Sequence, residues 1–266
     1  MRPVTASSPR DLDLSELFRL DGRVAVVTGA SSGLGDRFAR VLHAAGATVV
    51  AAARRAERLD DLADQLGERL VPVAVDLTDA DAREDLMARA LAVTGAVDVL
   101  VNNAGYGVPA AAETEPLEHF TRTLDINLVA LYHLSQLAAR PMLAAGSGAI
   151  VNIASVLGLV ASAPIKEAAY CASKGAVVNL TRQLGCEWGR KGVRVNAIAP
   201  GWFPSEMTQE EMFDDESGFA FITRNTPMGR GGELDELDGA LLFLAGDAST
   251  YVTGHVLAVD GGWLAR

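Results

Sequence analysis

The amino-acid sequence predicts an α/β fold in which a parallel sheet carries helices on both faces. Short apolar runs rich in Val and Ala alternate with longer stretches of helical periodicity. The apolar runs are continuous, which is typical of strands buried on both faces of a parallel sheet. A glycine-rich turn follows the first run and opens a helical stretch. Repeated units of this kind make right-handed crossovers and predict a doubly wound sheet.

Seven apolar runs are expected to form strands, and the periodic stretches between them are expected to form helices. Ligands of doubly wound sheets bind at the carboxyl ends of the strands, so the residues just after each strand are candidates for a site. The expected strands cover residues 23–28, 47–53, 70–75, 97–102, 149–154, 193–198 and 255–259. The expected helices cover residues 34–45, 57–66, 81–94, 117–144, 168–190 and 233–245.

The composition narrows the class of protein. With 266 residues, the chain fits one domain with a buried core, and we expect a flexible leader over 1–20 before a single domain over 21–266. The net charge of −11 argues against a nucleic-acid partner. No run reaches the ~18 consecutive apolar residues of a membrane span. Two cysteines and four scattered histidines predict neither a disulfide framework nor a metal site, and a cytoplasmic protein is expected.

The glycine-rich turn covers residues 28–35, TGASSGLG. Its glycines let the backbone approach a ligand closely, and the following helix start suits a pyrophosphate. A strand-to-helix turn without a ligand has the same residues, because the spacing differs from the common Gly-x-Gly-x-x-Gly fingerprint. The turn also matches Gly-x-Ser-x-Gly, the nucleophile elbow of hydrolases. Ser31 would then be the nucleophile, with Asp247 and His255 following in the triad order.

The residues after the second and third strands point to a dinucleotide. Arg54 stands where such a site meets the adenosine ribose, and an Arg there accommodates a 2′-phosphate. This favours NADPH over NADH, although a solvated basic pair with Arg55 is the alternative. Asp76 could accept a hydrogen bond from the adenine amino group, or it could be an acid near a helix N-cap.

Tyr170 and Lys174 lie four residues apart on a predicted helix and therefore share one face. A free tyrosine titrates near pH ~10, and a neighbouring cation is expected to lower its pKa. The pair could then act as a general acid/base. A surface Tyr and Lys would show the same spacing, since short motifs recur by chance. The catalytic interpretation gains support because Ser155 and the other strand-end residues converge on one edge of the sheet.

These motifs together resemble the short-chain dehydrogenase/reductase family in its single-domain branch. The resemblance extends from about Leu20 to the C-terminus and implies a Rossmann-like seven-stranded sheet of order 3-2-1-4-5-6-7. It also implies a homotetramer or homodimer formed through the two long helices. The matching residues are Thr28, Gly29, Gly33, Gly35, Asn102, Asn103, Ala104, Gly105, Asn127, Ser155, Tyr170, Lys174, Pro200 and Gly201.

The resemblance implies a role for each catalytic residue. Tyr170 would protonate the carbonyl oxygen, to which Ser155 would hydrogen-bond. Lys174 would bind the nicotinamide ribose and lower the pKa of Tyr170, and Asn127 would hold a water linking Lys174 to solvent. The cofactor, NADP(H) preferred with NAD(H) possible, would be bound by Gly29, Ser31, Ser32, Gly33, Leu34, Gly35, Arg54, Asp76, Leu77, Asn103, Ala104, Gly105, Tyr170, Lys174, Pro200, Gly201, Phe203 and Ser205.

A substrate lid is implied over about residues 203–228. Its acids, from Glu206 to Glu216, are expected to form a solvated acidic face. Met207, Met212 and Phe213 are expected to supply an inward apolar face, which would suit a neutral or apolar substrate. The segment after Pro200 looks most like gluconate-type polyol dehydrogenases and acyl-thioester reductases. Residues 164–167 are an insertion relative to the common pattern, beside the substrate pocket.

The leading hypothesis is an NADPH-dependent oxidoreductase that transfers hydride between nicotinamide and a carbonyl or secondary alcohol. A non-catalytic NADP-binding sensor on the same fold is the alternative, because a fold does not fix function. The intact set of Asn127, Ser155, Tyr170 and Lys174 argues against the sensor. An epimerase or dehydratase of the family's larger branch is disfavoured, because too little chain follows Gly201 for an added substrate domain.

Overall fold

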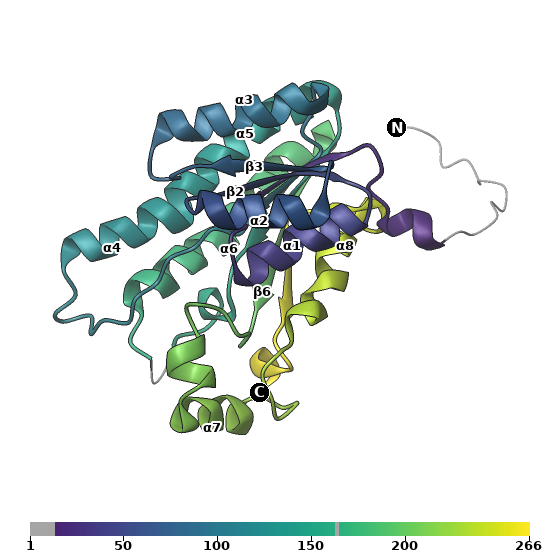
Figure 1. Ribbon diagram of the computed structural model, residues 1–266. Helices are drawn as coiled ribbons and strands as arrows, with labels where there is room; N and C mark the ends of the chain where they lie inside the picture. The colour runs from purple at the N-terminus through teal and green to yellow at the C-terminus, as the bar shows by residue number, and fades with distance from the viewer. Residues whose placement is uncertain (1–13, 163–164) are drawn as a thin grey trace.

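The computed structural model describes residues 14–162 and 165–266. Seven strands form one sheet of order β3-β2-β1-β4-β5-β6-β7 (Figure 1). Every neighbouring pair is parallel, so the expected α/β class and strand order are confirmed. The strands are β1 Val24–Thr28, β2 Thr48–Ala53, β3 Leu70–Ala74, β4 Val99–Asn102, β5 Gly148–Ile153, β6 Val193–Pro200 and β7 Val256–Val259.

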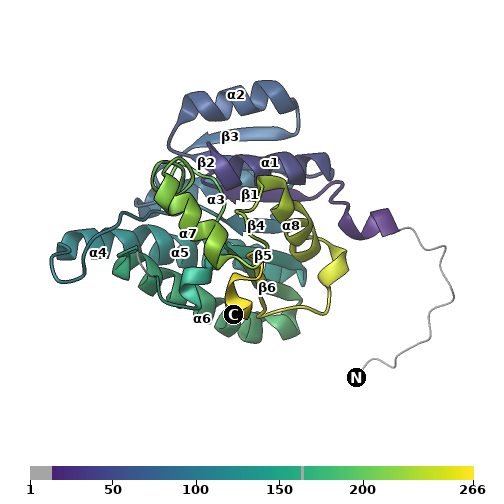
Figure 2. The same cartoon turned by 90° about the horizontal axis from the view of Figure 1, so that it is seen from below.

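Helices cover both faces of the sheet (Figures 1 and 2). Helices α1, α2 and α8 pack on one face, and α3, α5 and α6 pack on the other. Helix α7 lies at one end of the sheet, beside the C-terminus (Figure 1). The α-helices are α1 Gly33–Ala44, α2 Ala56–Leu66, α3 Ala80–Thr94, α4 Leu117–Leu124, α5 Ala130–Ala145, α6 Ala168–Trp188, α7 Glu216–Asn225 and α8 Asp238–Ala245.

Each central strand contributes to two apolar cores. In β1, Val24 and Val26 join the cluster under α3 and α5, whereas Ala25 and Val27 join the cluster under α1 and α8. All four are fully buried. Successive side chains of a strand point to opposite faces, so a strand covered on both sides must be apolar at every position. This explains the continuous apolar runs in the sequence.

The long helix expected over 117–144 is divided in the structure. Helices α4 and α5 are joined by a π-helical segment, Asp125–Val129. A π turn widens the helix by one residue and often marks a functional position. Here it contains the fully buried Asn127. The helix expected over 233–245 likewise begins as a 3₁₀ turn, Leu234–Leu237, before α8.

Part of the segment expected to form a leader has defined structure. Residues 1–13 lie outside the described part of the chain, but Leu14–Phe18 forms a 3₁₀ helix. Leu20 is fully buried in the core, and its N–H donates to the carbonyl of Ala45 at 2.7 Å. A leucine side chain with its backbone paired in this way belongs to the folded unit. Within the described residues, no helix combines the length and apolarity needed to cross a membrane.

A buried polar ladder links the sheet to the helices near its carboxyl edge. The Asn102 amide donates to the hydroxyl of Ser135 and to Oδ1 of Asn152, both at 2.9 Å. The Asn152 amide donates to the hydroxyl of Thr181 at 3.0 Å. Buried polar groups are costly unless paired, so these bonds fix β4 and β5 against α5 and α6.

Replacing Leu100 by Ala should lower the free energy of unfolding by about 2–5 kcal/mol, because the substitution leaves a cavity in the core. Leu100 is 0% exposed in the middle of β4. Leu14→Ala is the matched control, since this leucine is 59% exposed, and its effect should stay within about 0.5 kcal/mol. Urea denaturation of the two variants measures both values, and equal losses would contradict the assignment of the core.

Candidate active site

A pocket of about 570 Å³ lies at the carboxyl edge of the sheet. It is lined by residues that follow each strand from β1 to β6, together with residues of α6. Every residue expected to bind the cofactor lines this pocket, from Gly29 to Ser205, and so does Ser155. Asn127 does not belong to the lining. The parallel sheet therefore brings these separated motifs to one place.

The glycine-rich turn is shaped by close backbone contacts. Gly29 has a φ of +69°, in the left-handed region that favours glycine. A Cβ on Gly35 would lie 2.1 Å from the carbonyl oxygen of Gly29, so no larger residue fits there. Ser32 is the N-cap of α1, but its side chain makes no capping hydrogen bond. The start of α1 therefore faces the pocket with backbone N–H groups that suit an anion.

The loop after β4 is fixed against the end of β1. The hydroxyl of Thr28 accepts hydrogen bonds from the backbone N–H groups of Asn103 and Ala104, both at 3.0 Å. The Asn103 side-chain amide donates to the carbonyl of Thr28 at 2.9 Å. Gly105 then comes close to the catalytic candidates, since a Cβ there would lie 3.7 Å from Nζ of Lys174. The absence of a side chain at this position leaves room in the pocket.

Tyr170, Ser155 and Lys174 come together at the floor of the pocket. The Ser155 side chain is within hydrogen-bonding reach of Tyr170, and its oxygen also accepts the N–H of Leu157 at 3.1 Å. Nζ of Lys174 lies 5.6 Å from the centre of the Tyr170 ring. It donates to the carbonyl of Ile153 at 2.7 Å. This arrangement places a hydroxyl pair and an ammonium beside one cavity, as proton transfer requires.

Asn127 lies behind this group. Its Oδ1 accepts the N–H of Tyr106 at 2.7 Å, and its amide donates to the carbonyl of Tyr106 at 2.8 Å. The same amide donates to the hydroxyl of Ser173 at 2.9 Å. The side chain thus joins the loop after β4 to the helix that carries Tyr170 and Lys174.

Burial governs the protonation of Tyr170 and Lys174. Burial, followed by the nearby charge of Glu167, raises the pKa of Tyr170, and the hydrogen bond from Ser155 opposes this. Burial also lowers the pKa of Lys174 to about 8. The pKa of Tyr170 therefore lies above its usual value, and the hydrogen bond with Ser155 is the interaction that lowers it. The ammonium lies over the ring and hydrogen-bonds to Ile153, while desolvation disfavours charge on both groups.

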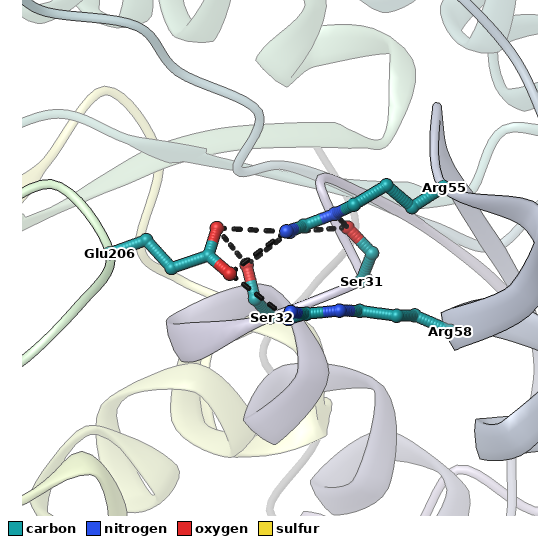
Figure 3. Close-up of polar contacts among 5 residues, drawn as sticks. All are labelled: Ser31, Ser32, Arg55, Arg58 and Glu206. Carbon is teal, nitrogen blue, oxygen red and sulfur yellow. Dashed lines mark hydrogen bonds and ion pairs between the residues drawn. The ribbon is translucent and has the colours of Figure 1, made fainter.

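Arg55 reaches the glycine-rich turn. Its Nε and Nη2 donate to the Ser31 hydroxyl at 3.2 and 3.0 Å, and Nη2 donates to the Ser32 hydroxyl at 2.8 Å. Figure 3 shows Arg55 and Arg58 around the carboxylate of Glu206. Hydrogen bonding by Arg55 is the main cause that lowers the pKa of Glu206. The adjacent basic pair in the sequence could have indicated Arg55, but nothing in the sequence indicated that Glu206 would reach it.

Other residues that line the pocket were not expected. Tyr106, Arg122, Ile126 and Ile153 are among them. The guanidinium of Arg122 lies 5.1 Å from the ring centre of Tyr106, so the two side chains form one wall. Arg122 and Ile126 come from α4 and the π segment, which follow a long loop after β4, and the strand-end rule did not reach that far along the chain.

The expected apolar face of the lid is correct only for Met207. Met207 lines the pocket, whereas Met212 and Phe213 do not. Met212 is buried in an apolar cluster with Trp202 and Trp263, and Phe213 packs against the same cluster. The two residues hold the lid segment against the body of the protein and do not face the site.

The insertion beside the pocket is anchored to the loop after β4. Pro164 lies outside the described residues. The carbonyl of Lys166 accepts the N–H of Ala110 at 2.7 Å, and Ile165 packs against the apolar cluster of the lid. The described part of the insertion, residues 165–167, is therefore held by the loop after β4 and by the lid cluster.

The hydrolase hypothesis for Ser31 is not supported. Ser31 follows β1 at the carboxyl edge of the sheet, whereas His255 precedes β7. Because all strands are parallel, His255 lies at the opposite edge and cannot activate Ser31. The Ser31 hydroxyl is hydrogen-bonded by Arg55 instead.

Comparisons with known proteins show which family the chain resembles along most of its length. The family model described as enoyl-(acyl carrier protein) reductase matches residues 29–264. Galactitol 2-dehydrogenase (L-tagatose-forming) of Cereibacter sphaeroides is 42% identical over 254 residues, covering 95% of this chain and 99% of that protein. Gluconate 5-dehydrogenase of Gluconobacter oxydans is 42% identical over 255 residues, covering 93% and 96% of the two chains.

A solved structure is also similar to this chain in fold and sequence. The crystal structure of a gluconate 5-dehydrogenase from Burkholderia cenocepacia, in complex with NADP and tartrate, matches with a TM-score of 0.89 at 36% identity. The match covers 95% of this chain and 99% of that chain. The present chain therefore belongs to the short-chain dehydrogenase/reductase family. It is an NAD(P)-dependent oxidoreductase acting on CH–OH groups. Family membership therefore favours the hypothesis of an enzyme over that of a non-catalytic NADP-binding sensor.

Lys174→Met should change the dependence of stability on pH. The pKa of Lys174 is about 8 in the folded protein, against 10.5 for a free lysine side chain, which represents the unfolded chain. Between these two pH values the folded state therefore binds fewer protons than the unfolded state. Wild-type stability relative to the variant should therefore rise with pH across this window, by at most about 1.4 kcal/mol per pH unit. Denaturant unfolding of both proteins at pH 7.5, 9 and 10 measures the difference. A constant difference would contradict the lowered pKa.

Proposed function

We propose that this enzyme uses NADP(H) in preference to NAD(H) to interconvert a secondary alcohol of a polyol or sugar acid and the corresponding ketone. The observation that carries the proposal is the convergence of the glycine-rich turn, two arginines and the Tyr170 group on one pocket. The named relatives act on galactitol and gluconate, which supports the substrate class.

The pocket fits a phosphorylated dinucleotide. The open start of α1 and the close approach at Gly35 suit a pyrophosphate. Arg54 and Arg55 follow β2, where the adenosine ribose lies in sites of this architecture, and Arg55 already pairs with the hydroxyl of Ser31. Guanidinium groups bind a phosphate through paired hydrogen bonds, which supports the preference for the 2′-phosphorylated cofactor. When bound, the nicotinamide supplies or accepts the hydride.

Tyr170 acts as the general acid/base in this proposal. Its raised pKa keeps the phenol protonated at neutral pH, which is the form that gives a proton to a carbonyl oxygen in the reductive direction. Ser155 donates a hydrogen bond to the same oxygen and stabilises the developing alkoxide. Lys174 holds the ribose, and Asn127 positions the Lys174 helix through Ser173. Proton exchange with solvent passes through the Lys174 and Asn127 side of the pocket.

The proposal extends to the whole molecule. Residues 21–266 act as one dinucleotide-binding and catalytic domain, and Leu20 belongs to it because its side chain is buried in the core. The lid of this domain covers about residues 203–228. The protein is cytoplasmic and forms a homotetramer or homodimer. Support for the assembly comes from large apolar side chains exposed on or beside α4 and α5, namely Leu117, Val129 and Tyr132.

Titration with NADPH and NADH, followed by nicotinamide fluorescence, tests the cofactor preference. NADPH should bind at least about tenfold more tightly, since charge-assisted hydrogen bonds hold its 2′-phosphate. Arg54→Ala, and likewise Arg55→Ala, should weaken NADPH by about tenfold and leave NADH within about twofold. Tighter binding of NADH by the wild type would contradict the assignment of the arginines.

Tyr170→Phe should lower kcat at least about 100-fold while cofactor affinity stays nearly unchanged, because only the transferable proton is removed. Oxidation of galactitol and D-gluconate with NADP⁺, followed at 340 nm, measures the loss. Tyr251→Phe is the matched control, since this tyrosine is fully exposed and far along the chain from the site. Near-normal turnover of the Tyr170 variant would remove the proposed role.

A further inference from the structure

The carboxylate of Glu206 occupies a site built for an anion. Oε1 accepts hydrogen bonds from Nη1 of Arg55 at 2.9 Å and from Nη1 of Arg58 at 3.0 Å. Oε2 accepts hydrogen bonds from Nη2 of Arg55 at 3.0 Å and from the hydroxyl of Ser32 at 3.1 Å. All four donors come from the glycine-rich turn or the start of α2, and Glu206 lies about 150 residues later in the chain (Figure 3).

These donors are the ones that a phosphate would use. A guanidinium fork binds a carboxylate or a phosphate in the same paired geometry, and serine hydroxyls at a helix start complete such sites. Arg55 gives both of its terminal nitrogens to Glu206. A phosphate taking the same fork must displace the carboxylate, because two anions against one guanidinium repel each other.

Glu206 is also part of the lid. It lies between Ser205 and Met207, and all three residues line the pocket. The Ser205 hydroxyl is 2.9 Å from the hydroxyl of Thr208, which donates to the carbonyl of Phe203 at 2.6 Å. The contact of Glu206 with Arg55 therefore joins the first turn of the lid to the residues that follow β2. Breaking this contact removes one of the interactions that hold the segment after β6.

We propose that Glu206 is a cofactor-specificity residue that fills the 2′-phosphate subsite of the free enzyme and is displaced by NADP(H) but retained beside NAD(H). The inference rests on the proposed preference for NADP(H). The arriving 2′-phosphate exchanges one anion for another on Arg55 and Arg58, and the lid segment is released in the same step. NAD(H) has no 2′-phosphate, so the contact of Glu206 with Arg55 and Arg58 stays intact when NAD(H) binds.

Glu206→Gln provides the direct test. The neutral amide competes poorly for the arginines, so NADPH and the fragment 2′,5′-ADP should bind about three- to tenfold more tightly. NADH and 5′-AMP should stay within about twofold. Affinities are measured by isothermal titration calorimetry on the full chain, with thermal melting to check that each variant is folded.

Glu210→Gln is the matched control. It removes the same charge from the same lid, but Glu210 is exposed and makes no hydrogen bond or ion pair with the residues that the structure describes. Its effect should be at most about twofold and equal for the phosphorylated and unphosphorylated nucleotides, as expected for a screened, distant charge.

Two results would overturn the inference, and a third would reject the proposed function. Weaker or unchanged NADPH binding by Glu206→Gln would show that the carboxylate does not compete with the cofactor. Equal tightening of NADPH and NADH would place the competition at the pyrophosphate or in the general charge of the lid. Failure of the wild type to bind NADPH at all would instead reject the proposed function, so the two failures are distinguishable.

Amide hydrogen exchange over residues 205–213 gives a second, independent readout. Added 2′,5′-ADP should speed exchange in this segment of the wild type, because the contact with Arg55 is broken, and 5′-AMP should not. In Glu206→Gln the exchange should already be fast without any nucleotide. Slower exchange on addition of 2′,5′-ADP would contradict release of the lid.

Discussion

The parallel direction of all seven strands is the constraint on which the rest of this structure depends. Because every strand ends at the same edge, short polar segments that are far apart in the sequence meet there without any direct pairing between them. The hydroxyl of Thr28 shows how closely they meet, since it accepts the backbone N–H groups of two residues that follow β4. The same constraint separates Ser31 from His255, and it thereby removes the hydrolase chemistry that the glycine-rich motif alone permits.

Burial decides the chemistry of the catalytic group more than pairwise charge does. Lys174 and Tyr170 stand on one face of α6, as their spacing requires, but desolvation shifts both toward their neutral forms. A protonated phenol beside Ser155 is well suited to donate to a carbonyl oxygen. The buried amide of Asn127, placed by a π turn between α4 and α5, joins this helix to the loop after β4.

Charged side chains dominate the part of the pocket around the glycine-rich turn. Arg55 and Arg58 are exposed side chains that gather hydroxyl and carboxylate partners around the glycine-rich turn. Exposed ion pairs contribute little to stability, and we propose that the role of this cluster is recognition. One carboxylate from the lid meets these arginines where a phosphate would bind, and cofactor choice and lid position can thus share one contact. Further along the lid, Met212 packs against Trp202 in a buried apolar cluster and holds the lid against the rest of the domain.

The sequence by itself determined the α/β class, the family resemblance with the strand order that it implies, and the strand-end residues that line the pocket, because continuous apolar strands and strand-end motifs are local patterns with a fixed topological meaning. Tertiary structure alone decided the burial of Leu20, the π turn at Asn127 and the direction of the Tyr170 pKa. It also turned Met212 into the core and brought Glu206 to Arg55. These features depend on which distant side chains surround a group, and the solvation and charge of those surroundings arise only when the chain is packed.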